Sequence, residues 1–396
     1  MSDEPELEVS GRPPAAALSL PGLLFPTRDG AAPVERLLWL CSRVSLSAAE
    51  LMDVTRTGEE LTNDDWKRIA ALAGANGVET LLFTHIAAAG LLDRVPPAIV
   101  ARMRQRYGEV AIGGRRLEMA LGRVLPLLER TQAPVIIVKG LPLARRLYGN
   151  IALRPVSDID LMIRIEDGPT VAAALRAAGF TPVAGKSAPL SRHALRFREM
   201  QFQDAKGRII EAHVNPCRYP AYRRAFAPEP IWAAAAPLSG PYHWGLGLAP
   251  HDELRFLCMH YAIQHHIGRL IWLTDVAEIA RRVPDTPAWD ALAADAISRG
   301  AAAPVAVTLA RARALLDAPV PEAALDRLRS AALATAERSA WESATREMSG
   351  LRWYLSQMTL MRSPLERAAL FWNGSAAFAG RLRRRVTRRG SRRADP

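Results

Sequence analysis

The residues most suited to chemistry are two aspartates, Asp158 and Asp160, in the segment DIDLMIRI at 158–165. The alternation of polar and apolar residues predicts a β-strand, on which residues two apart point to the same face. Two carboxylates on one rigid face are suited to binding one or two Mg²⁺ or Mn²⁺ ions. The alternative is a chance pair at a solvated strand end. Burial would favour the metal site, because two buried like charges are costly without a cation.

A third carboxylate, Glu211, lies in the segment RIIEAHV at 208–214. With REMQFQD at 198–204 and the intervening turn, this segment predicts a β-hairpin. If the hairpin pairs with the aspartate strand, Glu211 becomes a general base or a further metal ligand. His213 follows on the same strand face. It is expected either to position this carboxylate and contact phosphate, or to make a structural hydrogen bond.

A second candidate element is the turn Lys139-Gly140, which follows the apolar run 134–138 and precedes LPLARRLYGN. The run predicts a buried strand and the later segment a helix. Glycine lets a phosphate approach the backbone, a helix N-terminus attracts anions, and Lys139 adds a positive charge. The alternative is an ordinary strand-to-helix turn. Arg154, four residues before the first aspartate, either reaches the same phosphates or supports the loop.

The elements that would position these residues form a strand, a helix, a strand, a helix and a hairpin, which outline a small α+β core. The surrounding segments show helical spacing of apolar residues. The predicted organisation is a disordered N-terminus at 1–33, a helical region at 34–130, a core at 131–240, a second helical region at 241–345, an amphipathic segment at 346–380 and a basic disordered tail at 381–396.

Composition excludes several classes of protein. The chain of 396 residues carries a net charge of +12. Its last sixteen residues hold eight arginines and one aspartate, or +7, which leaves +5 for the rest. No apolar run reaches the ~18 residues of a membrane span. The three scattered cysteines fit neither a disulfide scaffold nor a cysteine zinc site. The acidic start does not resemble a signal peptide, so we expect a cytoplasmic protein.

The arginine-rich tail has two interpretations. As a cationic arm it would bind nucleic acid or an anionic membrane surface. As a solvated tail it would have no dedicated partner.

The segments KGLPLARRLYGN, RPVSDIDLMI, EAHV, LCMHYAIQHH and RLIWLTDVAEIARR, in this order, resemble a poorly characterised nucleotidyltransferase family of the DNA polymerase β-like superfamily. The resemblance covers about 60–345 and is strongest at 136–165. It implies a polymerase β-like fold with a small mixed sheet, an NTP substrate, Asp158 and Asp160 as metal ligands, Glu211 as the third carboxylate, and Gly140 at the nucleotide phosphates.

The chain departs from the family pattern at two places. Leu141 stands where the superfamily usually has Ser or a second Gly, so a hydroxyl contact to the phosphates is missing and Lys139 is the candidate to compensate. Val214 and Asn215 replace an aromatic residue, which affects the acceptor surface more than the metal site.

The resemblance also includes His260 and Asp275. Each either contacts the nucleotide or acceptor, or has a structural role. His260 and His265 are about 140° apart on an α-helix, so the spacing does not predict a helical zinc pair.

The resulting hypothesis is a Mg²⁺- or Mn²⁺-dependent nucleotidyltransferase that moves an NMP from an NTP to an unidentified acceptor. The occurrence of such families near peptide natural-product pathways suggests a peptide or a small molecule as the acceptor. One alternative is phosphoryl transfer with the same metal site. The other is a non-catalytic nucleotide-binding scaffold.

Overall fold

The computed structural model describes residues 31–183, 199–217, 219–265, 268–333, 337–338 and 341. The amphipathic segment and the basic tail predicted from the sequence lie outside the described residues, as does nearly all of the predicted N-terminal segment. No helix in the described part of the chain combines the length and the apolar character needed to cross a bilayer.

One mixed sheet organises the centre of the chain, in the strand order β3-β4-β5-β2-β1-β7-β6. Its strands are β1 (Ile136–Ile137), β2 (Asp158–Met162), β3 (Phe180–Pro182), β4 (Glu199–Asp204), β5 (Ile209–His213), β6 (Ala236–Pro237) and β7 (Leu246–Gly247). The predicted hairpin is confirmed, since β4 and β5 are antiparallel. Strand β5 then lies parallel to β2, so the hairpin joins the strand that carries the aspartates.

The helices are α1 (Pro33–Leu40), α2 (Ala48–Glu59), α3 (Asn63–Asn76), α4 (Glu79–Ala88), α5 (Pro97–Arg130), α6 (Leu141–Tyr148), α7 (Gly168–Ala177), α8 (Pro228–Ala234), α9 (Pro250–Met259), α10 (Leu270–Ala280), α11 (Thr286–Ser298), α12 (Ala302–Leu316) and α13 (Glu322–Ala332). Local signals define several ends. Helix α3 begins with a capping box at Thr62 and ends at Gly77 in a left-handed conformation. The fold is therefore α+β, as expected.

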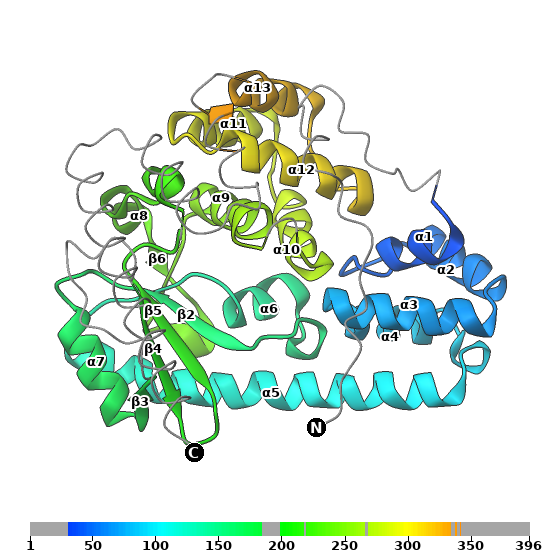
Figure 1. Ribbon diagram of the computed structural model, residues 1–396, viewed down its shortest axis with the longest axis horizontal. Coiled ribbons are helices and arrows are strands. Elements are labelled where there is room, and N and C mark those ends of the chain that lie inside the picture. The colour runs from blue at the N-terminus through cyan, green and yellow to red at the C-terminus, as the bar shows by residue number, and fades with distance from the viewer. Residues whose placement is uncertain are drawn as a thin grey trace, which may run out of the picture.

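The two faces of the central strands β2 and β5 differ in polarity. On the apolar face, buried side chains such as Ile159, Leu161 and Ile210 pack in one cluster with residues of α5 and α7. Figure 1 shows the long α5 running beneath the sheet and continuing under α3 and α4. Because side chains alternate along a strand, the polar side chains of β2 and β5 lie on the opposite face; these are Asp158, Asp160, Glu211 and His213.

The helical regions before and after the sheet share a second core. Buried residues of α1, α3 and α4, such as Leu37 and Trp66, belong to one apolar cluster with residues of α9, α10 and α12, such as Leu273. Figure 1 places the first set at one end of the molecule and the second set above the sheet, with α10 as the member of the second set that lies towards the first. The two regions predicted separately at 34–130 and 241–345 are thus packed together.

Helix α5 is tied to its neighbours by a buried carboxylate, Glu118. It accepts hydrogen bonds from Arg145 of α6 and from the Tyr242 hydroxyl, at 2.7 and 2.6 Å. Arg115 adds a contact at 2.7 Å. Burial alone would raise the pKa of Glu118, but these bonds outweigh it and lower the pKa to about 2.

Candidate active site

Three adjacent strands present the candidate site residues on one face of the sheet. In the register of β2 with β5, Asp160 lies opposite Glu211. In the register of β5 with β4, Glu211 lies opposite Gln201 and His213 lies opposite Glu199. Figure 1 shows β2 and β5 side by side in the sheet. The structure therefore brings the predicted carboxylates together because strands distant in sequence pair in this register.

A lysine ammonium group bridges the two aspartates. Lys139 Nζ lies 2.5 Å from Asp160 Oδ2 and 3.5 Å from Asp158 Oδ1. Asp160 is buried, and the side chain of Lys139 is 15 % exposed. Asp160 is therefore shielded from solvent while Asp158 is 28 % exposed, and Lys139 offsets part of their negative charge.

His213 connects the carboxylates of all three strands. Its Nε2 lies 3.2 Å from Asp160 Oδ1 and 3.5 Å from Glu211 Oε2, and its Nδ1 lies 3.4 Å from Glu199 Oε2. Glu211 Oε1 also accepts a hydrogen bond of 2.7 Å from Gln201 Nε2. Sequence analysis missed the contributions of Glu199 and Gln201. The hairpin register, had it been applied to β4, would have placed both on this face.

The pKa values of the site follow from this pairing. Burial would raise the pKa of Asp160, but the Lys139 charge and the hydrogen bond with His213 hold it well below its usual range. Burial would lower the pKa of Lys139, yet the two aspartates raise it. Burial likewise opposes protonation of His213, and its hydrogen bonds to carboxylates raise its pKa well above the ordinary value. At neutral pH Asp160 is therefore ionised, and Lys139 and His213 are protonated.

The predicted phosphate-binding turn has the expected backbone. Gly140 is the N-cap of α6 with φ 84° and ψ −110°, a conformation open mainly to glycine. A Cβ there would meet Val156 Cγ1 at 3.2 Å and the Asp158 carbonyl oxygen at 3.6 Å. The N-terminus of α6 thus lies beside β2, with Lys139 directly before it.

Arg154 lies in a buried ion pair, as the loop-supporting alternative requires. It donates from Nε and Nη2 to the two oxygens of Asp275, at 2.8 and 2.6 Å. The Tyr148 hydroxyl donates to Asp275 Oδ1 at 2.8 Å. The side chains of Arg154 and Asp275 are 4 % and 0 % exposed. Contact of either residue with nucleotide stays a prediction, but both are already engaged with each other.

The prediction that His260 and His265 point about 140° apart on an α-helix is wrong. Residues His260–Gln264 form a π-helical turn after α9, and the two Nε2 atoms lie 3.2 Å apart. A π-helix places residues five apart nearly above one another, whereas an α-helix separates them. Burial and then the Lys139 charge hold the pKa of His260 well below its ordinary value. A role at the acceptor stays a prediction.

The donor set fits a divalent cation. Ligand atoms of Asp160, Glu211 and His213 all lie within 4.8 Å of one another. Carboxylate oxygens suit Mg²⁺ and Mn²⁺, and an imidazole nitrogen is accepted more readily by Mn²⁺. The Lys139 ammonium already contacts one member of this group, Asp160. The predicted ligand Asp158 lies outside this group of three and is linked to it through Lys139.

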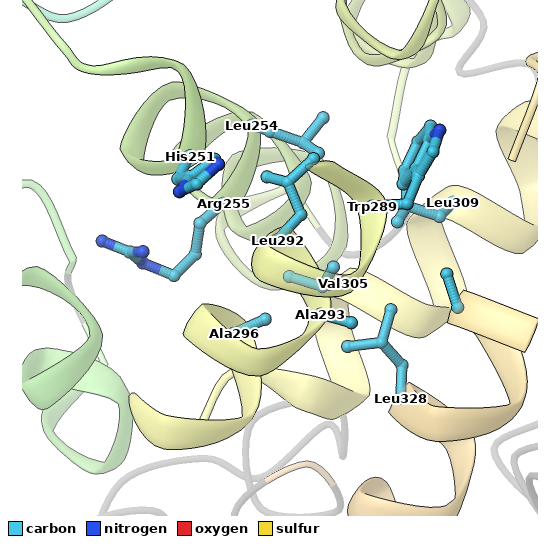
Figure 2. A pocket seen from close by; sticks show the side chains of 11 residues that line it. His251, Leu254, Arg255, Trp289, Leu292, Ala293, Ala296, Val305, Leu309 and Leu328 are labelled. Atoms are coloured by element: carbon cyan, nitrogen blue, oxygen red, sulfur yellow. The ribbon is translucent and has the colours of Figure 1, made fainter. Parts of the chain in front are cut away.

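A cavity elsewhere in the molecule is not a rival site. Figure 2 shows side chains of α9, α11, α12 and α13 around it, and residues such as Leu254, Trp289 and Leu309 make its lining mainly apolar. Its volume is about 10 Å³. That volume is about the minimum for one water molecule, so the cavity does not accommodate a nucleotide.

The site thus consists of paired carboxylates on β2, a third carboxylate on the adjacent strand β5 and the glycine-led helix α6 beside them. Residues 62–317 match the model of a family described as uncharacterised nucleotidyltransferase. The chain belongs to this family, because the match spans well over half of its length. Comparison with curated proteins and with solved structures finds no match.

Proposed function

We propose that the protein transfers an NMP from a Mg²⁺- or Mn²⁺-bound NTP to an acceptor hydroxyl or phosphate. The observation that carries this proposal is the convergence of Asp160, Glu211 and His213 within 4.8 Å, beside Asp158 and the N-terminus of α6. Family membership supports nucleotidyl transfer, and the donor set supports its dependence on a divalent cation.

The roles of the residues follow from their positions. Asp158, Asp160 and Glu211 would hold the divalent cation, with His213 as the group that orients the carboxylates, or as a further ligand once a bound cation has displaced its proton. Such a cation, when bound, acts as a Lewis acid on phosphate oxygens. The backbone at Gly140 and the start of α6 would receive the triphosphate, because unpaired N–H groups at a helix N-terminus favour anions.

The chemical step is a substitution at the α-phosphorus. A bond forms between the acceptor oxygen and this phosphorus, and the bond to the bridging oxygen of the β-phosphate breaks. Pyrophosphate leaves with the electron pair of that bond. Glu211 is suited to receive the acceptor proton, because its side chain is 15 % exposed while that of Asp160 is 7 % exposed.

The acceptor is proposed to be a peptide or small molecule in the cytoplasm, where NTPs are available. The arginine-rich tail is proposed to contact nucleic acid or an anionic membrane.

The test is label transfer in a cell lysate depleted of small molecules, with Mg²⁺ or Mn²⁺ and ATP labelled at either the α- or the γ-phosphate. The proposal predicts transfer of the α label only, and loss of transfer in the Asp158→Ala/Asp160→Ala double variant. Transfer of the γ label only would instead establish phosphoryl transfer. Transfer of the α label by the double variant at the wild-type rate would contradict the assigned site.

A further inference from the structure

We propose that Lys139 is a movable counter-cation. In the nucleotide-free protein its ammonium occupies the carboxylate site, and on nucleotide binding it moves to the triphosphate, so that divalent cations bind well only together with nucleotide. This inference rests on the proposed function and adds an order of binding to it.

The first observation is the place that the ammonium occupies. Lys139 Nζ lies between Asp160 and Asp158, at 2.5 and 3.5 Å. These are the carboxylates proposed to hold the divalent cation. An ammonium and a divalent cation within ~4 Å of each other repel strongly even at an effective dielectric of ~20. Because of this repulsion, the ammonium of Lys139 in the site weakens the binding of Mg²⁺ or Mn²⁺ there, and a bound divalent cation displaces the ammonium.

The second observation is that Lys139 lies directly beside the proposed triphosphate site. The residue directly precedes Gly140, the N-cap of α6, where the triphosphate is proposed to bind. Lysine is a point charge on a flexible stem of four carbons and commonly binds phosphate. A triphosphate at the start of α6 would therefore compete with the aspartates for the same ammonium.

The third observation is the charge of the site without a divalent cation. The carboxylates of Asp160, Glu211 and Glu199 surround the imidazole of His213, and Asp158 and Asp160 contact the ammonium of Lys139. Removing the ammonium alone would leave this group of carboxylates strongly undercompensated. Replacement of the ammonium by a divalent cation would instead add one positive charge to a site with four carboxylates, so release of Lys139 and binding of the cation would favour each other.

The test measures two equilibria that do not depend on an acceptor. Binding of Mn²⁺ alone is followed by electron paramagnetic resonance, and binding of α,β-methylene-ATP in excess chelator by calorimetry. The Lys139→Met variant is compared with the wild type and with Lys67→Met. Lys67 provides a matched control, because its side chain is 66 % exposed and forms an ion pair with Asp64 on α3. Circular dichroism checks that each variant is folded.

The two affinities are expected to change in opposite directions. Lys139→Met should bind Mn²⁺ at least about tenfold more tightly than the wild type and the metal-free nucleotide at least about tenfold more weakly. Lys67→Met should change neither. Loss of a lysine with only a structural role would not change the Mn²⁺ affinity and the nucleotide affinity in opposite directions.

Unchanged Mn²⁺ affinity in Lys139→Met, with transfer of the α label intact in the wild type, overturns the inference and leaves the proposed function standing. If neither the wild type nor Lys139→Met binds Mn²⁺, with or without nucleotide, the metal site of the proposed function is overturned together with this inference.

Discussion

The buried ion pair between Arg154 and Asp275 allows a quantitative prediction about how the active-site strand is held. Arg154 lies on the segment that leads into β2, and Asp275 belongs to α10. The two side chains make two hydrogen bonds of 2.8 and 2.6 Å and are 4 % and 0 % exposed. The perturbation is Asp275→Asn, which keeps the shape of the side chain and removes its charge.

The expected cost follows from the charge that remains. Breaking a buried pair by neutralising one partner costs about 3–5 kcal/mol, because the other charge stays buried without compensation. At roughly 1–2 °C per kcal/mol for a chain of this length, Asp275→Asn should lower the melting temperature by about 3–10 °C. Replacing both partners, in Arg154→Met/Asp275→Leu, should cost less than Asp275→Asn alone, since no charge is then stranded.

The assay is thermal and urea unfolding followed by circular dichroism, with Asp53→Asn as the matched control. Asp53 forms an ion pair with Arg56 at 2.7 Å, and both side chains are largely exposed, at 47 % and 65 %. Loss of such a surface pair costs about 0–1 kcal/mol. If Asp275→Asn destabilises the protein no more than Asp53→Asn does, the reasoning about burial at this pair is refuted.

Two further predictions concern α5 and the phosphate turn. The folded-state pKa of Glu118 is lowered to about 2. Its ionised form therefore contributes to the free energy of unfolding above the ordinary carboxyl pKa near 4.5, and this contribution is lost as pH falls from there towards 2. After a discount for solvent screening, Glu118→Gln should lower the free energy of unfolding at pH 7 by about 1–2 kcal/mol and flatten its pH dependence between these two pKa values. Urea unfolding at a series of pH values measures both effects, and an equal pH dependence in the wild type and the variant would contradict the prediction. Gly140→Ala should cost about 1–3 kcal/mol, because its φ of 84° strains an L-residue and the added Cβ meets Val156, and it should weaken nucleotide binding measured by calorimetry. Unchanged stability and affinity would show that the turn tolerates a side chain.

The elements around the site were predictable because local signals define them. The alternation in DIDLMIRI and in the hairpin segments predicts strands, and glycine between a strand and a helix predicts the turn at Gly140. The sequence also suggested that Asp160 and Glu211 converge. The register that makes them neighbours is set by packing of the apolar face on α5 and α7, which no local pattern encodes.

What could not be predicted depends on contacts between distant segments. The pairing of Arg154 with Asp275 joins residues 121 positions apart, so the sequence left the role of Arg154 open. The pairing of His260 with His265 requires a π-helical turn, and the helical periodicity of the segment gave no sign of it. The bridging position of Lys139 likewise depends on β1 pairing with β2.

The most direct test of the central claim is nucleotide transfer by the Asp160→Asn variant. Folded Asp160→Asn and a control, Asp93→Asn at an exposed position, are compared with the wild type in the rate at which α-labelled ATP modifies acceptors of the lysate. The account predicts a loss of at least about a hundredfold for Asp160→Asn, because a carboxylate that holds the catalytic cation is neutralised, and an unchanged rate for Asp93→Asn. Transfer by Asp160→Asn at the wild-type rate would contradict the assignment of this sheet face as the site of nucleotidyl transfer.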